Sequence, residues 1–396
     1  MQRFGTLGIA GRAARTSAAV GAVAAVLFAM ASFAPPASAK PAAVTYQVTQ
    51  ILSGTSLHHS YQRAGSGVWH SEPLTQPDDI TRVGGDLFTT FQNGVGPQGQ
   101  AATDGNRDST IVEFTLAGVP VNQWDLRGKC DGLTANPATG LVVATIDEDA
   151  NSSLYTIDPF TNTVTHYRYD KSPLPHNGGT DAIEFYNGLM LISASAPGTV
   201  GAAAPQPYYP GVYIVTLDPA NQVAYVKPLF YDEADATAAN GPHAGHTVRL
   251  GLTDPDSNED VPFNAPRFAG DFMLTSQGDK EQIFVQGAGT PFQHLWVLHI
   301  SNSVDDTAWA SAPYGAFYAA SHDLDAIDRI SAAVWSVGTV LVAVTPCDAN
   351  NAPATCPAPG FPPNYLGSEN MFTGQLTPLP VTGAKAEPQG MIFVPA

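Results

Sequence analysis

The chain has 396 residues, with 35 Asp and Glu against 17 Lys and Arg, so its formal net charge at neutral pH is −18. A surface this acidic repels nucleic acid and anionic membranes, so we expect neither as a partner. Only 13% of the residues are charged, while 37 are Gly and 33 are Pro, which favours many short strands joined by turns.

The first 39 residues have the pattern of a secretory signal peptide. Arginines precede an apolar run over residues 18–33, and Ala37-Ser38-Ala39 supplies a small-x-small cleavage site. An uncleaved membrane anchor is the alternative, but Pro35-Pro36 and the cleavage site argue against it. We expect cleavage near Ala39, leaving residues 40–396 as one secreted, monomeric domain without a membrane span.

A unit of four strands repeats along the rest of the chain. Each copy begins with an Asp, a short apolar strand, a turn containing Gly and a second apolar strand, and the leading residues are Asp79, Asp131, Asp181 and Asp306. The first three copies start about 50 residues apart, and a hairpin-like strand pair follows in each. Four antiparallel strands at this period are typical of a propeller blade. We therefore predict an all-β propeller.

The two ends of the chain extend this prediction. The C-terminal "EPQGMIFVPA" has the pattern of a first blade strand, and the N-terminal "AVTYQVTQILSG" is its natural partner. One blade built from both ends would close the ring and hide its sheet edges. Starts near residues 79, 131, 181, 246, 306 and 387 predict six blades, while irregular fourth and fifth units leave five or seven open. A stacked sandwich is the alternative, but sandwiches do not repeat a whole four-strand unit.

In these repeats the chain resembles six-bladed propellers of the NHL, SMP-30/gluconolactonase and TolB-like kind. The resemblance covers roughly residues 75–396 and rests on the blade pattern, above all on "DGLTANPATGLVVAT" and "PQGMIFVP". It implies the fold alone. The complete metal-ligand pattern of the gluconolactonases is not found, so their site residues are not carried over to this chain.

Propeller geometry predicts where a functional site would lie. The leading residue of each blade falls in the connection that opens at the mouth of the central channel. The residues expected there are Asp79, Asp131, Asp181 and Asp306, with His176, His243 and His246 in neighbouring loops. Carboxylates held close together raise one another's pKa or recruit a cation. The alternatives are that each Asp caps a turn and that the loop histidines are simply exposed.

Three segments alternate acidic and amide oxygens, as calcium sites do. "DGNRD" and "DEDAN" precede strands in equivalent blades, which favours a structural Asx-type turn. "DPDSNED" lies in the longest insertion and is the best calcium candidate, with Asp254, Asp256, Asn258 and Asp260 as its ligands. None of the three has the Gly and Glu positions of an EF-hand.

The three cysteines suit an exported protein. Cys347 and Cys356 bracket a short loop containing Pro, which predicts a local disulfide. Cys130 is left over, and we expect a small buried residue there rather than a nucleophile.

Two functions of different class are compatible with these residues. In the first, the channel mouth binds a divalent cation, calcium being one choice, and the chain is a metal-dependent lactonase- or esterase-like hydrolase, or a lyase. Asp131 and Asp181 would then be ligands, and His243 or His246 the general base. In the second, the propeller is a non-catalytic module that binds a small molecule, glycan or extracellular partner. Motifs of serine hydrolases, zinc proteases and nucleotide-binding proteins are absent.

Overall fold

The computed structural model describes residues 45–63, 67–176, 178–195, 209–347 and 364–396. The expected signal peptide and Cys356 lie outside these residues, so cleavage near Ala39 and the pairing of Cys356 with Cys347 stay predictions. Among the described residues, helix is limited to the 3-10 turns η1 (Gly54–Ser56) and η2 (His322–Leu324). Neither of these described turns is long and apolar enough to span a membrane. The fold is all-β, as predicted.

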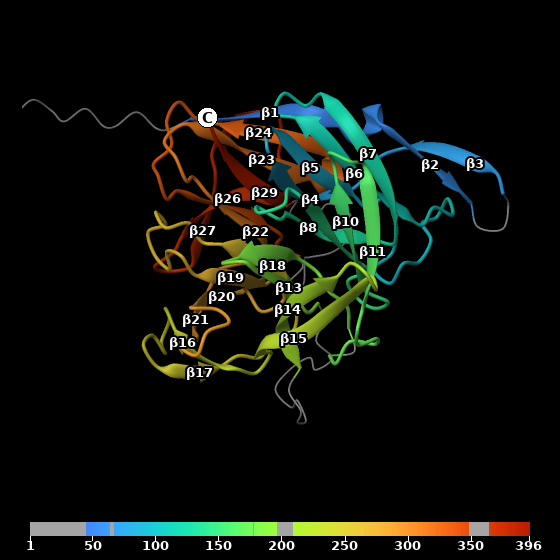
Figure 1. Ribbon diagram of the computed structural model, residues 1–396. Helices are drawn as coiled ribbons and strands as arrows, with labels where there is room; N and C mark the ends of the chain where they lie inside the picture. Colours follow the sequence, from blue (N-terminus) through green and yellow to red (C-terminus); the bar gives the residue numbers. More distant parts are fainter. Residues whose placement is uncertain (1–44, 64–66, 177, 196–208, 348–363) are drawn as a thin grey trace, which may run out of the picture. The chain divides into compact units, whose positions relative to one another are not determined.

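The first part of the chain forms a four-stranded and an eight-stranded sheet (Figure 1). The four-stranded sheet contains β4 (Pro77–Val83), β5 (Asp86–Phe91), β6 (Asp108–Thr115) and β7 (Pro120–Arg127) in that order. The eight-stranded sheet joins two such units through a parallel contact of β11 with β15. Its strands are β8 (Cys130–Ala135), β9 (Val142–Ile146), β10 (Ser153–Asp158), β11 (Thr163–Tyr169), β12 (Ile183–Tyr186), β13 (Leu189–Ser193), β14 (Pro210–Asp218) and β15 (Val223–Tyr231).

Two further sheets follow along the chain. One has the order β17-β16-β21-β20-β19-β18. It contains β16 (Asp235–Ala238), β17 (Thr247–Arg249), β18 (Pro255–Asp260), β19 (Phe272–Ser276), β20 (Glu281–Gln286) and β21 (His294–His299). The other contains β22 (Val304–Trp309), β25 (Val340–Val344), β26 (Tyr365–Asn370) and β27 (Gln375–Pro378). The fourth repeat thus begins at β18, and the start expected near residue 246 is wrong, because residue 246 lies in the turn between β16 and β17.

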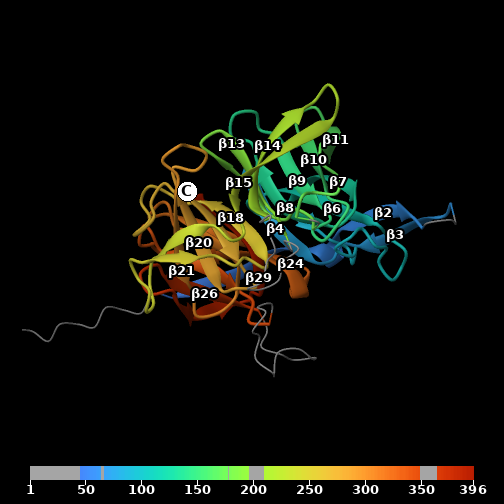
Figure 2. The same ribbon diagram turned by 90° about the horizontal axis from the view of Figure 1, so that it is seen from below.

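Both ends of the described chain belong to one sheet of order β28-β1-β24-β23-β29. Its strands are β1 (Tyr46–Ser53), β23 (Gly315–Ser321), β24 (Ala326–Ser331), β28 (Val381–Gly383) and β29 (Pro388–Pro395). The two terminal segments share a sheet as expected, but β24 and β23 lie between β1 and β29. A separate hairpin of β2 (His58–Gln62) and β3 (Trp69–Pro73) extends away from these strands in both views (Figures 1 and 2).

The core lies between consecutive sheets, which is why many strands are apolar on both faces. β9 reads VVATI and is buried throughout. Its Val142 and Ala144 pack with Phe88 of β5 and Trp124 of β7 in one cluster. Cys130 belongs to the same cluster with no exposed surface, as a small buried residue would.

Six strands, called the inner strands below, each lie at one edge of a sheet and contact one another in succession: β4, β8, β12, β18, β22 and β29. Their backbones approach closely. A Cβ added to Gly132 of β8 would lie 2.5 Å from the carbonyl oxygen of Asp181, just before β12. A Cβ at Gly390 of β29 would lie 2.5 Å from the carbonyl oxygen of Asp78 in β4. Glycine at these two positions therefore lets neighbouring inner strands meet.

The same irregularity recurs in the inner strands. In β4 the register with β5 shifts between Pro77 and Ile80. Equivalent shifts span two residues in β8, β18, β22 and β29. A bulge interrupts pairing and re-aims side chains, and bulges are frequent beside functional sites. The bulge residues are Asp78-Asp79, Asp131-Gly132, Asp256-Ser257, Asp305-Asp306 and Gln389-Gly390.

Candidate functional site

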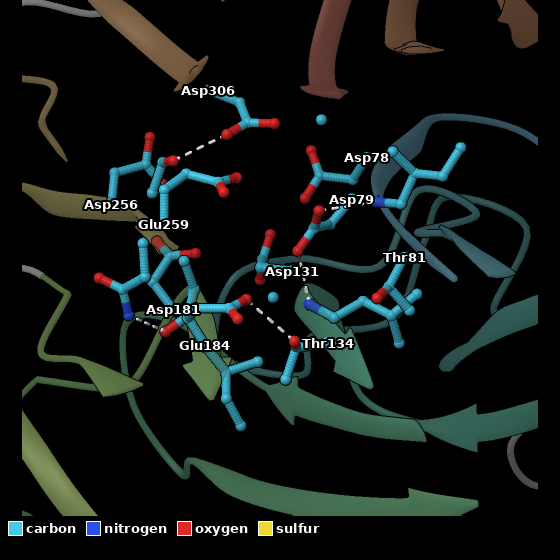
Figure 3. A pocket seen from close by; sticks show the side chains of 18 of the residues that line it. Asp78, Asp79, Thr81, Asp131, Thr134, Asp181, Glu184, Asp256, Glu259 and Asp306 are labelled. Carbon is cyan, nitrogen blue, oxygen red and sulfur yellow. Dashed lines mark hydrogen bonds between the residues drawn. The ribbon is translucent and has the colours of Figure 1, made fainter. Parts of the chain in front are cut away.

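The bulges of the inner strands line one pocket of about 90 Å³. At the first bulge position stand Asp78, Asp131, Asp256 and Asp305, and Asp181 takes the corresponding place immediately before β12. We call these five residues the acidic ring. Several of their side chains, with Glu184 and Glu259, point toward a common space in Figure 3. None of the described residues lining the pocket is Lys or Arg.

The second bulge position has a different role. Asp79 Oδ2 accepts a hydrogen bond from the backbone N–H of Leu133 in the next sheet at 2.6 Å (Figure 3). Asp306 Oδ2 likewise accepts from the backbone N–H of Met391 at 2.5 Å. Both carboxylates thus join neighbouring inner strands while lining the pocket. Of the four aspartates expected at the channel mouth, Asp131 and Asp181 belong to the acidic ring, and Asp79 and Asp306 are these cross-links.

Three carboxylates come close enough to hold a metal ion. Asp131, Glu148 and Asp181 each offer one oxygen, and these oxygens lie within 4.8 Å of one another. Glu148 is in the turn after β9, which is fixed because Lys129 donates its backbone N–H to Asp147 Oδ1 at 2.9 Å. Asp131 is only 4% exposed, and its Oδ2 is buried without a hydrogen-bond partner. A buried unpaired carboxylate oxygen is costly unless a cation or donor satisfies it.

A lysine ammonium already contacts this group. Lys129 Nζ lies 2.7 Å from Asp131 Oδ1 and 2.5 Å from Glu148 Oε1. Burial lowers the pKa of Lys129, but Asp131, Glu148 and Asp78 outweigh it and hold the pKa well above its usual range. The lysine is therefore a permanent positive charge beside the metal-ligand candidates.

Burial and mutual repulsion shift the ring carboxyls strongly. Burial, followed by the charge of Glu148, raises the pKa of Asp131 to about 7. Burial is also the main cause that raises the pKa of Asp181, Asp78 and Asp256 well above the usual value, and neighbouring ring carboxylates add to it. Carboxyls that are buried and crowded in this way take up a proton or a cation more readily than isolated carboxyls do.

Two glutamates lie further along the inner strands. Glu184 of β12 accepts a hydrogen bond from Thr134 Oγ1 at 3.0 Å, and burial raises its pKa to about 8 (Figure 3). Burial and the charge of Asp306 raise the pKa of Glu259 in β18 well above normal. Carboxyls that titrate near neutral pH are suited to proton transfer.

The histidines expected beside the carboxylates are elsewhere. His176 is fully buried, with Nδ1 2.7 Å from Tyr213 Oη and Nε2 2.7 Å from the carbonyl oxygen of Gly179. Burial lowers its pKa to about 4, so it packs as a neutral ring. His243 and His246 are exposed in the turn between β16 and β17, at the opposite edge of their sheet from β18. The structure therefore does not bring them to this pocket, and their role as general bases stays a prediction.

The expected calcium loop is a strand. Residues Pro255–Asp260 form β18, so "DPDSNED" does not wrap around an ion by itself. Asp256 belongs to the acidic ring, and Asn258 donates its side-chain amide to the carbonyl oxygen of Ala182 at 2.8 Å. Asp254 precedes the strand, and Asp260 is exposed at its end. Of the four residues, Asp256 and Asn258 line the pocket, whereas Asp254 and Asp260 do not, and calcium binding by this segment stays a prediction.

Sequence reasoning misses several pocket residues. Asp78 and Asp305 each stand directly before a predicted aspartate. From two consecutive aspartates the sequence does not show which one takes the first bulge position. Pro77, Pro255 and Pro388 each stand directly before a bulge, and aligning the repeats on them would have found the right register. Glu148 lies within "DEDAN", whose pattern in the sequence favours a structural turn, and nothing in the sequence pattern points to Lys129. Both residues reach the site from connections outside the inner strands.

Neither a protein-family model nor a curated protein matches this chain by sequence. Similar solved structures include a protein of unknown function from Bacteroides caccae, with 8% identity, coverage of 88% of this chain and 99% of that one, and a TM-score of 0.43. A protein proposed to be a 6-phosphogluconolactonase, from Bacteroides uniformis, has 10% identity, coverage of 89% and 99%, and a TM-score of 0.41. A luciferin-regenerating enzyme has 12% identity, coverage of 73% and 96%, and a TM-score of 0.37.

These similarities concern the fold alone, and none carries an argument about activity. Each is similar to this chain in its fold, at low sequence identity. The chain is an all-β protein with a propeller-like arrangement of sheets.

Proposed function

We propose that the pocket binds a divalent cation and that Asp131, Glu148 and Asp181 are its ligands. The observation that carries this proposal is the approach of their three oxygens to within 4.8 Å, with Asp131 Oδ2 buried and unpaired. Carboxylate oxygens are hard ligands, which suits calcium or magnesium better than a thiophilic metal. The half-buried Asp78 and Asp256 add two further carboxyl groups to the lining of the pocket.

The fold proposed with this function is a closed ring of six repeat units, two of which share the eight-stranded sheet. The contacts between inner strands run from β4 through β8, β12, β18 and β22 to β29, and β29 contacts β4. This order supports a channel on whose wall five of the six inner strands place a bulge. Convergence of the inner strands explains how five repeats that each contribute one or two acids produce one strongly acidic pocket.

Hydrolysis of a lactone or ester is the second candidate function. The observation that favours it is Glu184, whose pKa burial raises to about 8, in the same pocket as Asp131 and Asp181. A carboxylate with such a pKa is suited to accept a proton from water. Ligand binding without catalysis needs no such group, so an activity assay separates the two functions.

Calorimetric titration of the chelator-treated protein with CaCl₂ and MgCl₂ tests the proposal. The wild type should bind one of these ions, and the double variant Asp131→Asn with Asp181→Asn should bind it at least about a hundredfold more weakly. Lactone and ester hydrolysis measured on the same samples, with and without chelator, tests the second candidate.

A matched control changes the same number of charges away from the pocket. Asp158 and Asp218 occupy equivalent hairpin turns, where each accepts hydrogen bonds from nearby backbone N–H groups. Asp158→Asn with Asp218→Asn should leave the cation affinity unchanged. Equal losses in both double variants, or no binding by the folded wild type, would refute the proposed site.

We also propose that the chain is exported and that Cys347 pairs with Cys356. The export pattern over residues 1–39 and the short loop between the two cysteines support this. Calcium is abundant outside cells, so an oxygen-rich site of modest affinity would be filled there.

A further inference from the structure

Lys129 contacts two of the three carboxylates that are proposed to hold the cation. Its Nζ contacts Asp131 Oδ1 at 2.7 Å and Glu148 Oε1 at 2.5 Å, and both residues belong to the metal-ligand group. The lysine side chain is only 16% exposed, so it is held inside the structure. An ammonium group has three donors and no acceptor, which makes it a direct substitute for a metal ion among carboxylates.

The ammonium leaves the group incompletely satisfied. Asp131 Oδ1 also accepts a hydrogen bond from Gln92 Nε2 at 2.7 Å, while Asp131 Oδ2 stays buried and unpaired. No ion pair joins Lys129 to Asp181, the third member of the group, among the contacts of the described residues. The lysine therefore neutralises one side of the group and leaves ligands for a further cation on the other.

We propose that Lys129 is a built-in competitor of the divalent cation, so that the ion binds fully only when the ammonium withdraws from Asp131 and Glu148. This inference rests on the proposed function, because it concerns the same ligands. Withdrawal is feasible because the four-carbon stem of lysine is flexible. The consequence is a site of reduced affinity, which fills only where divalent ions are plentiful.

Substitution of Lys129→Met tests this inference, because methionine keeps much of the stem and removes the charge. Titration with CaCl₂ and MgCl₂ should show binding at least about tenfold tighter than in the wild type, since one positive charge within a few ångströms of the ion is gone. Without divalent ions the variant should melt at a lower temperature, because Asp131 and Glu148 lose their partner. Added CaCl₂ should raise its melting temperature by more than it raises that of the wild type.

Arg127→Met is the matched control. Arg127 lies two residues earlier, its side chain is 57% exposed, and it pairs with Asp108 at 3.3 Å. The control removes the same charge from the molecule but not from the group, so its cation affinity should match that of the wild type. Tightening of equal size in both variants would show a general charge effect and overturn the inference.

The outcomes also separate this inference from the proposed function. Unchanged or weaker binding by Lys129→Met, with normal binding by the wild type, overturns the inference and keeps the cation site. Binding by Lys129→Met alone supports the competition and shows that the wild-type chain uses its lysine instead of an ion. Absence of binding in both proteins overturns both. If Lys129→Met does not fold without ions, Lys129→Gln refolded with and without CaCl₂ replaces it, and folding that does not depend on CaCl₂ counts against the inference.

Discussion

Glu369 is a buried carboxyl outside the pocket whose ionisation should weaken the fold. It is 9% exposed in β26, and Gln282 Nε2 donates to its Oε2 at 3.0 Å. Burial raises its pKa to about 7, and the bond from Gln282 lowers it in part. The folded state thus holds this proton more tightly than the unfolded chain, whose Glu titrates near about 4.3. The resulting stability is complete below the unfolded pKa and is lost as the pH rises through the folded one.

We therefore expect Glu369→Gln to flatten the pH dependence of stability. Between about pH 5 and 8 the wild type should lose on the order of 1–3 kcal/mol more than the variant, because glutamine cannot ionise. Urea unfolding at several pH values in chelator measures this. Glu72→Gln, at an exposed position in β3, is the control and should follow the wild type. Parallel profiles for Glu369→Gln and the wild type would show that Glu369 ionises without cost.

Individual site residues could be predicted from the sequence only where the same residue type recurs at the same position of each repeat. Asp131 and Asp181 could be predicted because each leads a repeat and stands alone. Asp78 and Asp305 could not, since adjacent residues of a strand face opposite ways and the bulge that decides the matter has no clear pattern in one sequence. The partners from outside the repeat, Lys129 and Glu148, depend on how two connections fold against each other.

The inner strands differ from the other strands because their polar residues face the pocket. Most four-strand units were predictable from apolar runs separated by hairpin turns, as β10 with β11 and β14 with β15 show. The sequence predicts a loop at β18 because its residues PDSNED have no apolar alternation. A strand that lines an acidic pocket on one side and packs on neighbours mainly through backbone contacts lacks the pattern on which strand prediction depends.

Substitution of the aspartate at the second bulge position should lower the stability of the fold without changing cation binding. Asp79 accepts hydrogen bonds from Leu133 N–H at 2.6 Å and from Ile80 N–H at 2.6 Å, so it links the first two sheets. Asp79→Asn places an amide donor against one of these N–H groups and should lower the free energy of unfolding by about 1–3 kcal/mol. Cation affinity should stay within about threefold of wild type, since both oxygens face backbone donors.

Chemical unfolding in chelator and calorimetric titration of the same samples check this prediction. Asp306→Asn is a parallel test, because Asp306 makes the equivalent bond to Met391 and a second one to Thr307. A large loss of cation affinity with unchanged stability would show that these carboxylates are ligands instead of cross-links.

At the scale of the whole molecule, the last strand, β29, completes the sheet that also contains the first strand, β1. β29 pairs with β23 along most of its length and contacts both β22 and β4. Its Met391 N–H also satisfies Asp306, and Gly390 packs on the backbone of Asp78. Removing residues 387–396 would expose the edge of β23, leave Asp306 without that donor and open the proposed ring between β22 and β4.

We expect the truncated chain to aggregate or to unfold at a much lower temperature than the full chain, because exposed sheet edges pair with other chains. Adding a synthetic peptide of residues 385–396 during refolding should restore a soluble protein, because the missing strand can pair with β23 as it does in the intact chain. A scrambled peptide of the same composition is the control and should not rescue. Size-exclusion chromatography and thermal melts measure both effects. A truncated chain that stays monomeric and melts like the full protein would mean that the sheets do not form a closed ring. It would also mean that the pocket keeps its shape without β29.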